Sequence, residues 1–378
     1  MAIFKPTRKI IIKNNKTMKR IVLAITAVAA LAACTKSEVN YDAPAEIGFK
    51  AVAGNMTKAV VDGTTYPTDL NMYIYAWTTT DNNGNPNTAT EANYIKNAEF
   101  EYKGVFGTYT GETDETGVNP NVWGGADQSY YWPNVKELYF AGYSASGNAS
   151  TNATYNCQTD VLTISNYTPG MSGANDLMWF PKTTQSYGKG TDYVPVNMYH
   201  TCAWITFLVK GDEVTSNTTN PYTITSLKMT EVDQTATVAC SNATTPKINW
   251  SGNTDKTGAA ADYAVTLKNG QIALTQTAKD IETDAVYAEA EGTTSSNIVV
   301  IPQVPGKLNL TYTYKSSTGS VLTEPVTGLD LKISDTPADN VWEAGKHYIY
   351  TITIKANEIL VAPTPVDWTD GNFNVTVE

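Results

Sequence analysis

Histidine and cysteine, which commonly perform catalysis, number only two and four in this sequence, and no residue stands in a complete catalytic motif. The two histidines, His200 and His347, lie in apolar segments with the pattern of strands, where structural roles are the simpler expectation. Residues 170–173 lack the Gly-x-Ser-x-Gly spacing of a nucleophilic serine. Residues 81–92 begin like a calcium loop but carry proline and alanine where glycine and glutamate are needed. We therefore expect no enzymatic activity and no cofactor or metal.

The amino-terminal segment has the pattern of an export signal. Residues 1–33 hold seven basic side chains and no acidic one, and residues 21–33 are apolar with one exception. A membrane-spanning helix needs about 20 apolar residues, so this stretch is too short and fits a secretory signal peptide instead. Met18 precedes two basic residues and is an alternative start to Met1.

Cys34 is the residue for which the sequence indicates a definite chemistry. It follows Leu31, Ala32 and Ala33. This tetrapeptide resembles a bacterial lipobox, in which the cysteine is acylated on sulfur and becomes the mature amino-terminus. Several acyl chains give stable anchoring, because each buried CH₂ contributes about 0.8 kcal/mol. We predict that Cys34 carries lipid, palmitate included; the alternative is an ordinary signal peptide followed by a chance cysteine.

The charge distribution narrows the choice of partners. The formal net charge is −11, from 26 basic and 37 acidic residues. Because residues 1–33 hold seven of the basic residues, the chain that follows them carries −18. It also contains no arginine, since Arg8 and Arg20 lie in the signal segment. Nucleic-acid and phosphate binding need clustered Lys and Arg, so both are unlikely by composition and we expect no nucleic-acid partner.

The remaining cysteines and the tryptophans have structural interpretations. Cys157, Cys202 and Cys240 are odd in number, so at most one pair can form a disulfide, and buried small apolar side chains are the simpler expectation. Tryptophans can stack on sugars, but core packing is the favoured role for four of them: Trp77, Trp123, Trp132 and Trp179.

Apolar residues recur with a period of two in many short segments separated by Asn, Gly, Asp and Pro. The segments predicted as strands are 47–52, 71–77, 100–102, 137–143, 161–164, 204–209, 222–229, 298–301, 308–314 and 348–354. Residues 278–290 come nearest to a helical pattern, and only weakly. The sequence therefore predicts an all-β fold, with two β-sandwiches rather than a barrel, a polar tether over residues 35–45, and a domain boundary near residue 190.

Several stretches, taken in order, resemble the fimbrillin family, the subunits of type V pili of Gram-negative anaerobes. They are residues 51–59, 131–133 before 138–141, 175–178, 200–207, 301–303, 342–348, and 357–361 before 366–368. The resemblance implies two tandem transthyretin-like β-sandwiches. It also implies export as a lipoprotein and removal of the first strand by a trypsin-like protease. A strand of another subunit then fills the open groove, and a fibre grows.

Lys58 and Ala59 match the processing step that the resemblance implies. They follow the predicted strand 47–52 in a loop rich in Gly, Asn and Thr. Cleavage after Lys58 would release residues 34–58, with the lipid and the first strand together. Processing in the family often follows arginine, which this part of the chain lacks. Either a protease that accepts lysine acts here, or the chain keeps its lipid as an anchor or terminal subunit and Lys58 is an exposed loop lysine.

The carboxy-terminus matches the donor strand. Phe373, Val375 and Val377 alternate with polar residues, as a strand inserted into a groove requires. Val366 and Trp368 are expected to fill further pockets. The alternative is an ordinary last strand that closes its own sandwich.

Together these features predict a signal peptide over 1–33, a removable tether and first strand over 34–58, an amino-terminal sandwich over 59–190 and a carboxy-terminal one over 191–378. We expect a structural subunit of adhesive cell-surface fimbriae, assembled by donor-strand exchange. Its partners would be other fimbrial subunits in a homo- or heteropolymer, and the outer membrane before processing. The alternatives are a monomeric surface lipoprotein that binds glycans or host ligands, and a surface hydrolase. Stalk, tip and anchor positions are all compatible with the sequence.

Overall fold

The described residues of the computed structural model fold almost entirely into β-strands. They are residues 45–53, 66–81, 85–105, 121–133, 137–169, 176–186, 193–241, 247–254, 263–282 and 298–367. Within them, helical structure is limited to α2 (Ala149–Asn152) and the 3-10 turn η3 (Lys268–Gly270). The prediction of an all-β fold is confirmed.

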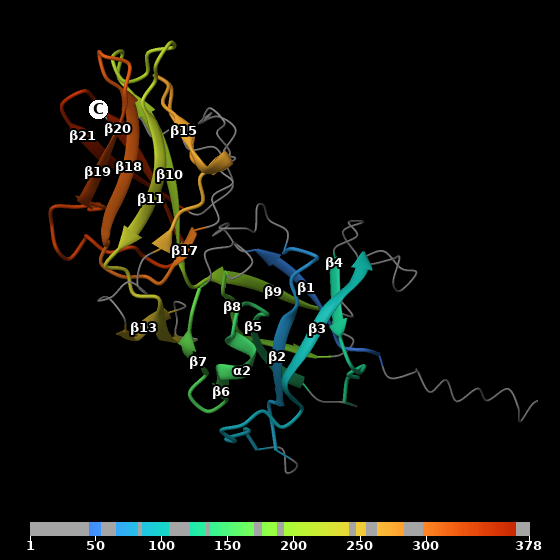
Figure 1. Ribbon diagram of the computed structural model, residues 1–378. Helices are drawn as coiled ribbons and strands as arrows, with labels where there is room; N and C mark the ends of the chain where they lie inside the picture. Colours follow the sequence, from blue (N-terminus) through green and yellow to red (C-terminus); the bar gives the residue numbers. More distant parts are fainter. Residues whose placement is uncertain are drawn as a thin grey trace, which may run out of the picture. The chain divides into compact units, whose positions relative to one another are not determined.

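Seven strands form a sheet that closes on itself. Their order is β1 (Gly48–Ala53), β4 (Asn121–Gly125), β3 (Ile95–Val105), β2 (Met72–Thr78), β5 (Glu137–Ser144), β8 (Met178–Ser186) and β9 (Tyr193–His200), which returns to β1. All neighbouring pairs are antiparallel except β1 and β9. Figure 1 shows β2, β3 and β4 of this sheet in blue to cyan. The closed order differs from the expected sandwich, in which each sheet keeps two free edges.

A four-stranded sheet shares a core with one part of the closed sheet. Its order is β13 (Lys247–Thr254), β12 (Thr235–Ser241), β7 (Val161–Tyr167) and β6 (Ala153–Asn156). Its inward residues pack with residues of β2, β5 and β8 in one buried cluster that includes Trp77, Tyr143, Ile164, Trp179 and Val238. The pair β12–β7 joins residues on both sides of position 190, and β9 also follows that position. These strands cross the predicted domain boundary near residue 190, and that boundary stays a prediction.

Two further sheets enclose the second large core. In one sheet the order is β16 (Lys279–Asp280), β10 (Ala203–Gly211), β20 (Lys346–Ile354) and β21 (Ile359–Asp367), with β17 (Ile298–Val300) also paired to β10. In the other it is β14 (Tyr263–Ala264), β11 (Thr223–Thr230), β18 (Lys307–Lys315) and β19 (Val321–Asp330), with β15 (Ile272–Ala273) also paired to β11. Phe207 and Tyr350 from the first sheet meet Met229 and Leu308 from the second in this core. The tandem transthyretin-like arrangement stays a prediction.

Each of the ten predicted strand segments coincides with an observed strand. The helix-like pattern of residues 278–290 is different: Lys279–Asp280 form β16, and residues 283–290 lie outside the described part. The strand is set by its antiparallel pairing with Leu208 and Val209 of β10, a tertiary contact that overrides a weak local preference.

Trp204 and His347 connect two of these layers. They occupy paired positions on β10 and β20, and their rings stack with centroids 3.5 Å apart. Trp204 belongs to the same buried cluster as Trp179, so this pair lies against the core shared by the closed and four-stranded sheets. His347 Nε2 lies 2.8 Å from the Thr206 hydroxyl, and burial lowers the pKa of His347 to about 3. The imidazole is therefore neutral at physiological pH.

This geometry predicts a specific pH dependence of stability. The unfolded chain binds a proton at His347 below about pH 6.5, whereas the folded chain does so only near pH 3. The stabilising contribution is thus complete above pH 6.5. It falls by about 1.4 kcal/mol per pH unit as the pH decreases towards 3. Urea unfolding of the His347→Gln variant between pH 7 and 4.5 should show a shallower loss of stability than the parent. Thr206→Val, which keeps the histidine, should retain the parent's slope; identical slopes in parent and His347→Gln would contradict the assignment.

Candidate functional site

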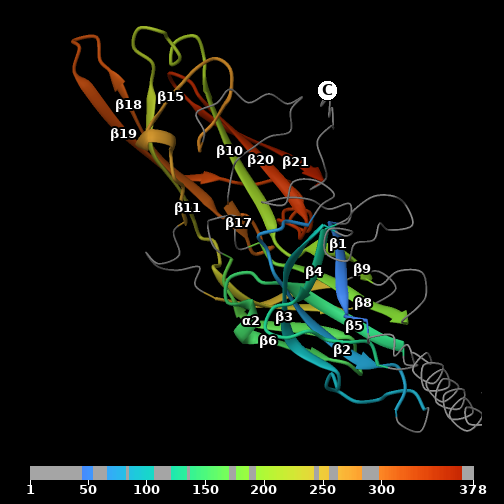
Figure 2. The same ribbon diagram turned by 90° about the vertical axis from the view of Figure 1, so that its right-hand side faces the viewer.

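The strand that closes the seven-stranded sheet is β1, the first described strand of the chain. It pairs in parallel with β9 over six residues, from Gly48 with Tyr193 to Ala53 with Met198. On its other side it pairs with β4 at one position, Phe49 with Trp123. Figure 2 shows β1 in blue between β4 and β9. The contacts of β1 are therefore made with strands distant in sequence.

Side chains of β1 fill the interior of the closed sheet. Ile47 and Phe49 are fully buried, and Ala51 nearly so. The ring of Phe49 meets Phe100 edge-on at 5.1 Å and Phe140 edge-on at 5.5 Å, and it also contacts Phe180 at 6.2 Å. Edge-to-face pairs of this kind add about 0.5–1.5 kcal/mol each to the burial of the rings. Phe49 is thus the central plug of an aromatic pocket whose walls come from β3, β5 and β8.

The position next to Phe49 can hold only a residue without a side chain while Tyr193 keeps its place. A Cβ atom added at Gly48 would lie 2.4 Å from two ring carbons of Tyr193. Tyr193 is 4% exposed and covers the backbone of β1 at this point. Glycine at position 48 therefore allows β9 to bring its tyrosine directly over the inserted strand.

Most of the predicted processing and donor residues lie outside the part of the chain that the structure describes. Cys34, Lys58, Ala59, Trp368, Phe373, Val375 and Val377 lie outside the described residues. Val366 lies in β21, where it is paired with His347. What the structure places is the strand that cleavage after Lys58 would remove, together with both of its partners.

The partner strand β9 was not among the predicted strands. Its residues Val194, Val196 and Met198 are buried and alternate with more exposed residues, which is the period-two signal. Pro195 interrupts that signal, because proline cannot donate to a sheet ladder and argues against a paired strand. In the structure Pro195 occupies the register position opposite Lys50.

The other candidate residues have structural environments. His200 is fully buried, and its Nδ1 contacts the Asp176 carboxylate. Cys157, Cys202 and Cys240 are buried and free, and burial raises the pKa of the Cys157 thiol to about 12. The predicted core role of the four tryptophans is confirmed, since each is at most 5% exposed: Trp77, Trp123, Trp132 and Trp179.

The described part of the chain holds no cluster of three or more His, Cys, Asp or Glu side chains that suits a metal ion. None of its helical segments has the length and apolar character that crossing a membrane requires. The expectation of no enzymatic activity stays a prediction.

Several solved structures are similar to this chain at low sequence identity, and the first of the three below shares its fold. A fimbrial protein of Bacteroides vulgatus is 16% identical, with 86% of this chain and 99% of that chain covered and a TM-score of 0.55. A fimbrial assembly protein of Parabacteroides distasonis (13% identical, coverage 84% and 94%) has a TM-score of 0.38. The tip fimbrial protein Mfa3 of Porphyromonas gingivalis, with a carboxy-terminal truncation (13%, coverage 85% and 99%), has a TM-score of 0.29.

Sequence comparison places the chain in a family. Among curated proteins there is no match. The profile of the fimbrillin-like family, in contrast, matches residues 57–368, which is most of the sequence and includes every described strand after β1. The chain belongs to the fimbrillin-like family.

Proposed function

We propose that this chain is a structural subunit of a cell-surface fimbria, in which β1 is exchanged for a strand of a neighbouring subunit. The observation that carries the proposal is the position of β1. It is the first of the described strands, and it closes a sheet whose other six strands form a continuous series from β4 to β9 without it. Removal of β1 breaks no strand pairing among the other six strands. It leaves an open slot between β4 and β9 whose length, direction and side-chain pockets are those of β1.

Export and trimming would prepare the slot. In this proposal the chain reaches the outer membrane as a lipoprotein acylated at Cys34, and a protease then cleaves between Lys58 and Ala59. Since Cys34 and β1 both precede Lys58, one cut releases the lipid anchor and the closing strand together. The mature subunit leaves the membrane with an open sheet and enters the fimbrium at the cell surface.

The open slot is a strong acceptor. Loss of Phe49 empties the pocket formed by Phe100, Phe140 and Phe180, and deleting a buried phenylalanine side chain costs about 3–5 kcal/mol. The backbone groups of β9 that face β1 lose their partners at the same time. Insertion of a foreign strand restores both the ladder and the pocket, which is recognition by strand addition.

The carboxy-terminal segment suits the slot in one register. Residues 371–377 (Gly-Asn-Phe-Asn-Val-Thr-Val) align with residues 47–53 (Ile-Gly-Phe-Lys-Ala-Val-Ala) when Phe373 takes the place of Phe49. Val375 and Val377 then occupy the places of Ala51 and Ala53, and the donor runs parallel to β9. Asn372 stands where Gly48 lies, so the Tyr193 ring has to move aside from the position that it holds over β1. A head-to-tail contact of this kind does not close, so it builds a fibre. Trp368 and Val366 precede the donor and would fill contacts at the subunit junction.

Processing at Lys58 is tested by amino-terminal sequencing together with gel analysis of surface protein. The parent chain should begin at Ala59 and form SDS-resistant ladders, because the emptied slot takes up strands of other copies. Lys58→Gln should keep the acylated Cys34 and give no ladders. A parent chain that keeps Cys34 and forms no ladders would contradict the proposal and support a monomeric surface lipoprotein.

The donor assignment predicts opposite results for neighbouring residues. Phe373→Ala should abolish the ladders of trypsin-treated protein, because the largest pocket of the slot stays empty. Thr376→Ala, on the outward side of the same segment, should leave them within about twofold of the parent. Trp368→Ala should weaken assembly without abolishing it. Normal ladders from Phe373→Ala would remove this segment from the role of donor.

Gly48→Ala should loosen β1 in the unprocessed chain. The new methyl group meets the buried Tyr193 ring at 2.4 Å, and overpacking of this kind costs about 1–3 kcal/mol. Gly124→Ala on β4 is the matched control, since its methyl group meets first the flexible side chain of Lys103, at 3.1 Å. Urea unfolding should show a clear loss of stability for Gly48→Ala alone. Equal stabilities of the two variants would show that Tyr193 does not restrict this position.

A further inference from the structure

Lys103 stands at a break in the pairing of β3 with β4. Its two neighbours in β3 pair with consecutive residues of β4, Val122 and Trp123, so Lys103 is the extra residue of a β-bulge. Gly104, the next residue, has a φ of +127°, a backbone conformation that glycine adopts readily and other residues rarely do. A bulge turns a side chain away from the direction that regular alternation would give it. The local backbone therefore sets where this lysine points.

The Lys103 side chain lies over Gly124 of β4, together with the side chain of Glu46. A Cβ atom at Gly124 would be 3.1 Å from Lys103 Cγ, 3.3 Å from Lys103 Cε and 3.6 Å from Glu46 Oε1. Both side chains therefore lie at the same point of the backbone, close to each other. Glu46 directly precedes the buried Ile47 and is bridged to Tyr131, so this point is the entrance of the slot that β1 fills.

The charges at this entrance change when β1 leaves. Lys103 Nζ lies 2.8 Å from Glu101 Oε1, and the lysine side chain is only 23% exposed. Glu101 and Glu46 thus place two carboxylates beside one ammonium group. Glu101 belongs to β3 and stays, whereas Glu46 belongs to the segment that cleavage after Lys58 would remove. An incoming strand with an acidic residue at the place of Glu46 is therefore favoured electrostatically.

The carboxy-terminal segment carries an acidic residue at the corresponding place. Glu46 precedes Phe49, the residue that fills the aromatic pocket, by three positions. Asp370 precedes Phe373 by three positions as well. When Phe373 takes the place of Phe49, the carboxylate of Asp370 therefore takes the place of that of Glu46.

We propose that Lys103 recognises the incoming strand by pairing with Asp370 of the neighbouring subunit, and so favours one register. This inference rests on the proposed strand exchange. A slip that keeps the same side chains inward is of two residues at least. Such a slip would bring neutral Asn372 or Trp368 to the lysine and would withdraw Phe373 from the aromatic pocket. The pocket and the lysine at its entrance thus favour the same register.

A double-mutant cycle tests the pairing in the full chain, with the rate at which SDS-resistant ladders form after trypsin treatment as the measurement. Lys103→Gln and Asp370→Asn should each slow ladder formation about fivefold, because each leaves one charge at the entrance without the other. The double variant should also be slower by about fivefold and not by the product of the two effects, since the second change then removes nothing further. Damage to the fold by Lys103→Gln would instead leave the effect of Asp370→Asn undiminished.

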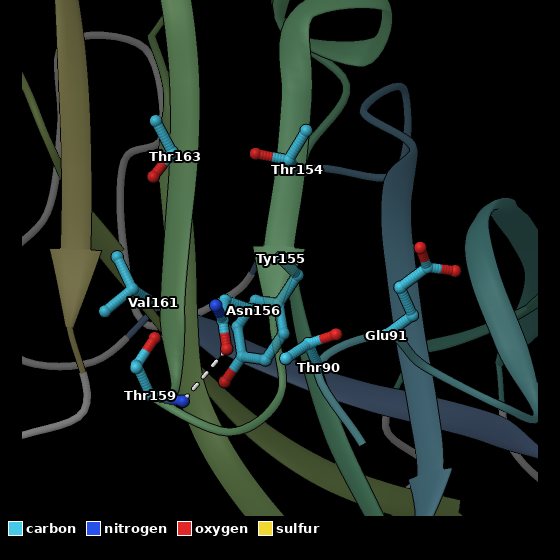
Figure 3. Close-up of a pocket in the computed structure, with 8 residues that line it drawn as sticks. All are labelled: Thr90, Glu91, Thr154, Tyr155, Asn156, Thr159, Val161 and Thr163. Atoms are coloured by element: carbon cyan, nitrogen blue, oxygen red, sulfur yellow. Dashed lines mark hydrogen bonds between the residues drawn. The ribbon is translucent and has the colours of Figure 1, made fainter.

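Lys96→Gln is the matched control, because it makes the same change at the other end of β3. Lys96 pairs with Glu91 at 3.4 Å. Glu91 lines a pocket beside the β6–β7 hairpin, as Figure 3 shows, and none of the residues that line it belongs to β1. Lys96→Gln should leave the rate of ladder formation unchanged, and Asp370→Asn should keep its full effect in that background.

The outcomes separate this pairing from strand exchange itself. Ladders from the parent, with effects of Lys103→Gln and Asp370→Asn that multiply in the double variant, would overturn the pairing and leave strand exchange intact. Equal rates for the parent and both single variants would do the same. A parent chain that forms no ladders would overturn strand exchange, and the pairing with it.

Discussion

The parallel pairing of β1 with β9, completed by the insertion of Phe49, is the interaction on which the rest of the account depends. Six consecutive register pairs fix the direction and length of the slot. The aromatic pocket around Phe49 fixes which side of an inserted strand faces inward. Because β1 comes first in the chain and has partners far from it in sequence, its removal leaves the remaining strands connected. The position of β1 in the chain, together with its position in the closed sheet, therefore makes this strand replaceable.

Three of the other sheet edges carry features that discourage strand addition. An edge strand presents unpaired backbone groups, and proline weakens such an edge because it has no N–H donor. The edge strand β19 contains Pro325, and β21 contains Pro363 and Pro365, two residues apart. The edge strand β6 of the small sheet is only four residues long. These edges favour addition at the β1 position over side-by-side association of subunits.

The sequence predicts many of the strands whose apolar alternation is strong, but not all of them, since β12 alternates clearly and is not among the predicted segments. Other strands are missed where another constraint hides the alternation. The alternation of residues 47–52 marks β1, whereas Pro195 conceals β9, its main partner. The strand β19 is exposed on most of its length, so Val321 and Leu322 give no alternating burial pattern. Pairing partners are beyond local sequence signals altogether: nothing near Thr163 indicates that Ala239 lies beside it.

The candidate sites likewise divide into those that a local sequence motif indicates and those that only the fold brings together. A motif read along the chain suffices to suggest acylation at Cys34, cleavage at Lys58 and a donor at Phe373. The aromatic pocket of Phe49 requires the fold, because it combines residues from separate strands. The tryptophans that could have stacked on sugars are core residues instead.

Hydrogen–deuterium exchange of the β9 amides tests the central claim most directly. In the intact chain those amides of Val194, Val196, Asn197 and Met198 that donate to β1 should exchange slowly, because β1 covers that edge; Pro195 has no amide hydrogen. They should exchange much faster in the cleaved monomer and become protected again in the polymer, when a donor strand occupies the slot. Unchanged slow exchange of these amides after removal of residues 34–58 would contradict the account, since it would mean that β1 is not what closes the sheet.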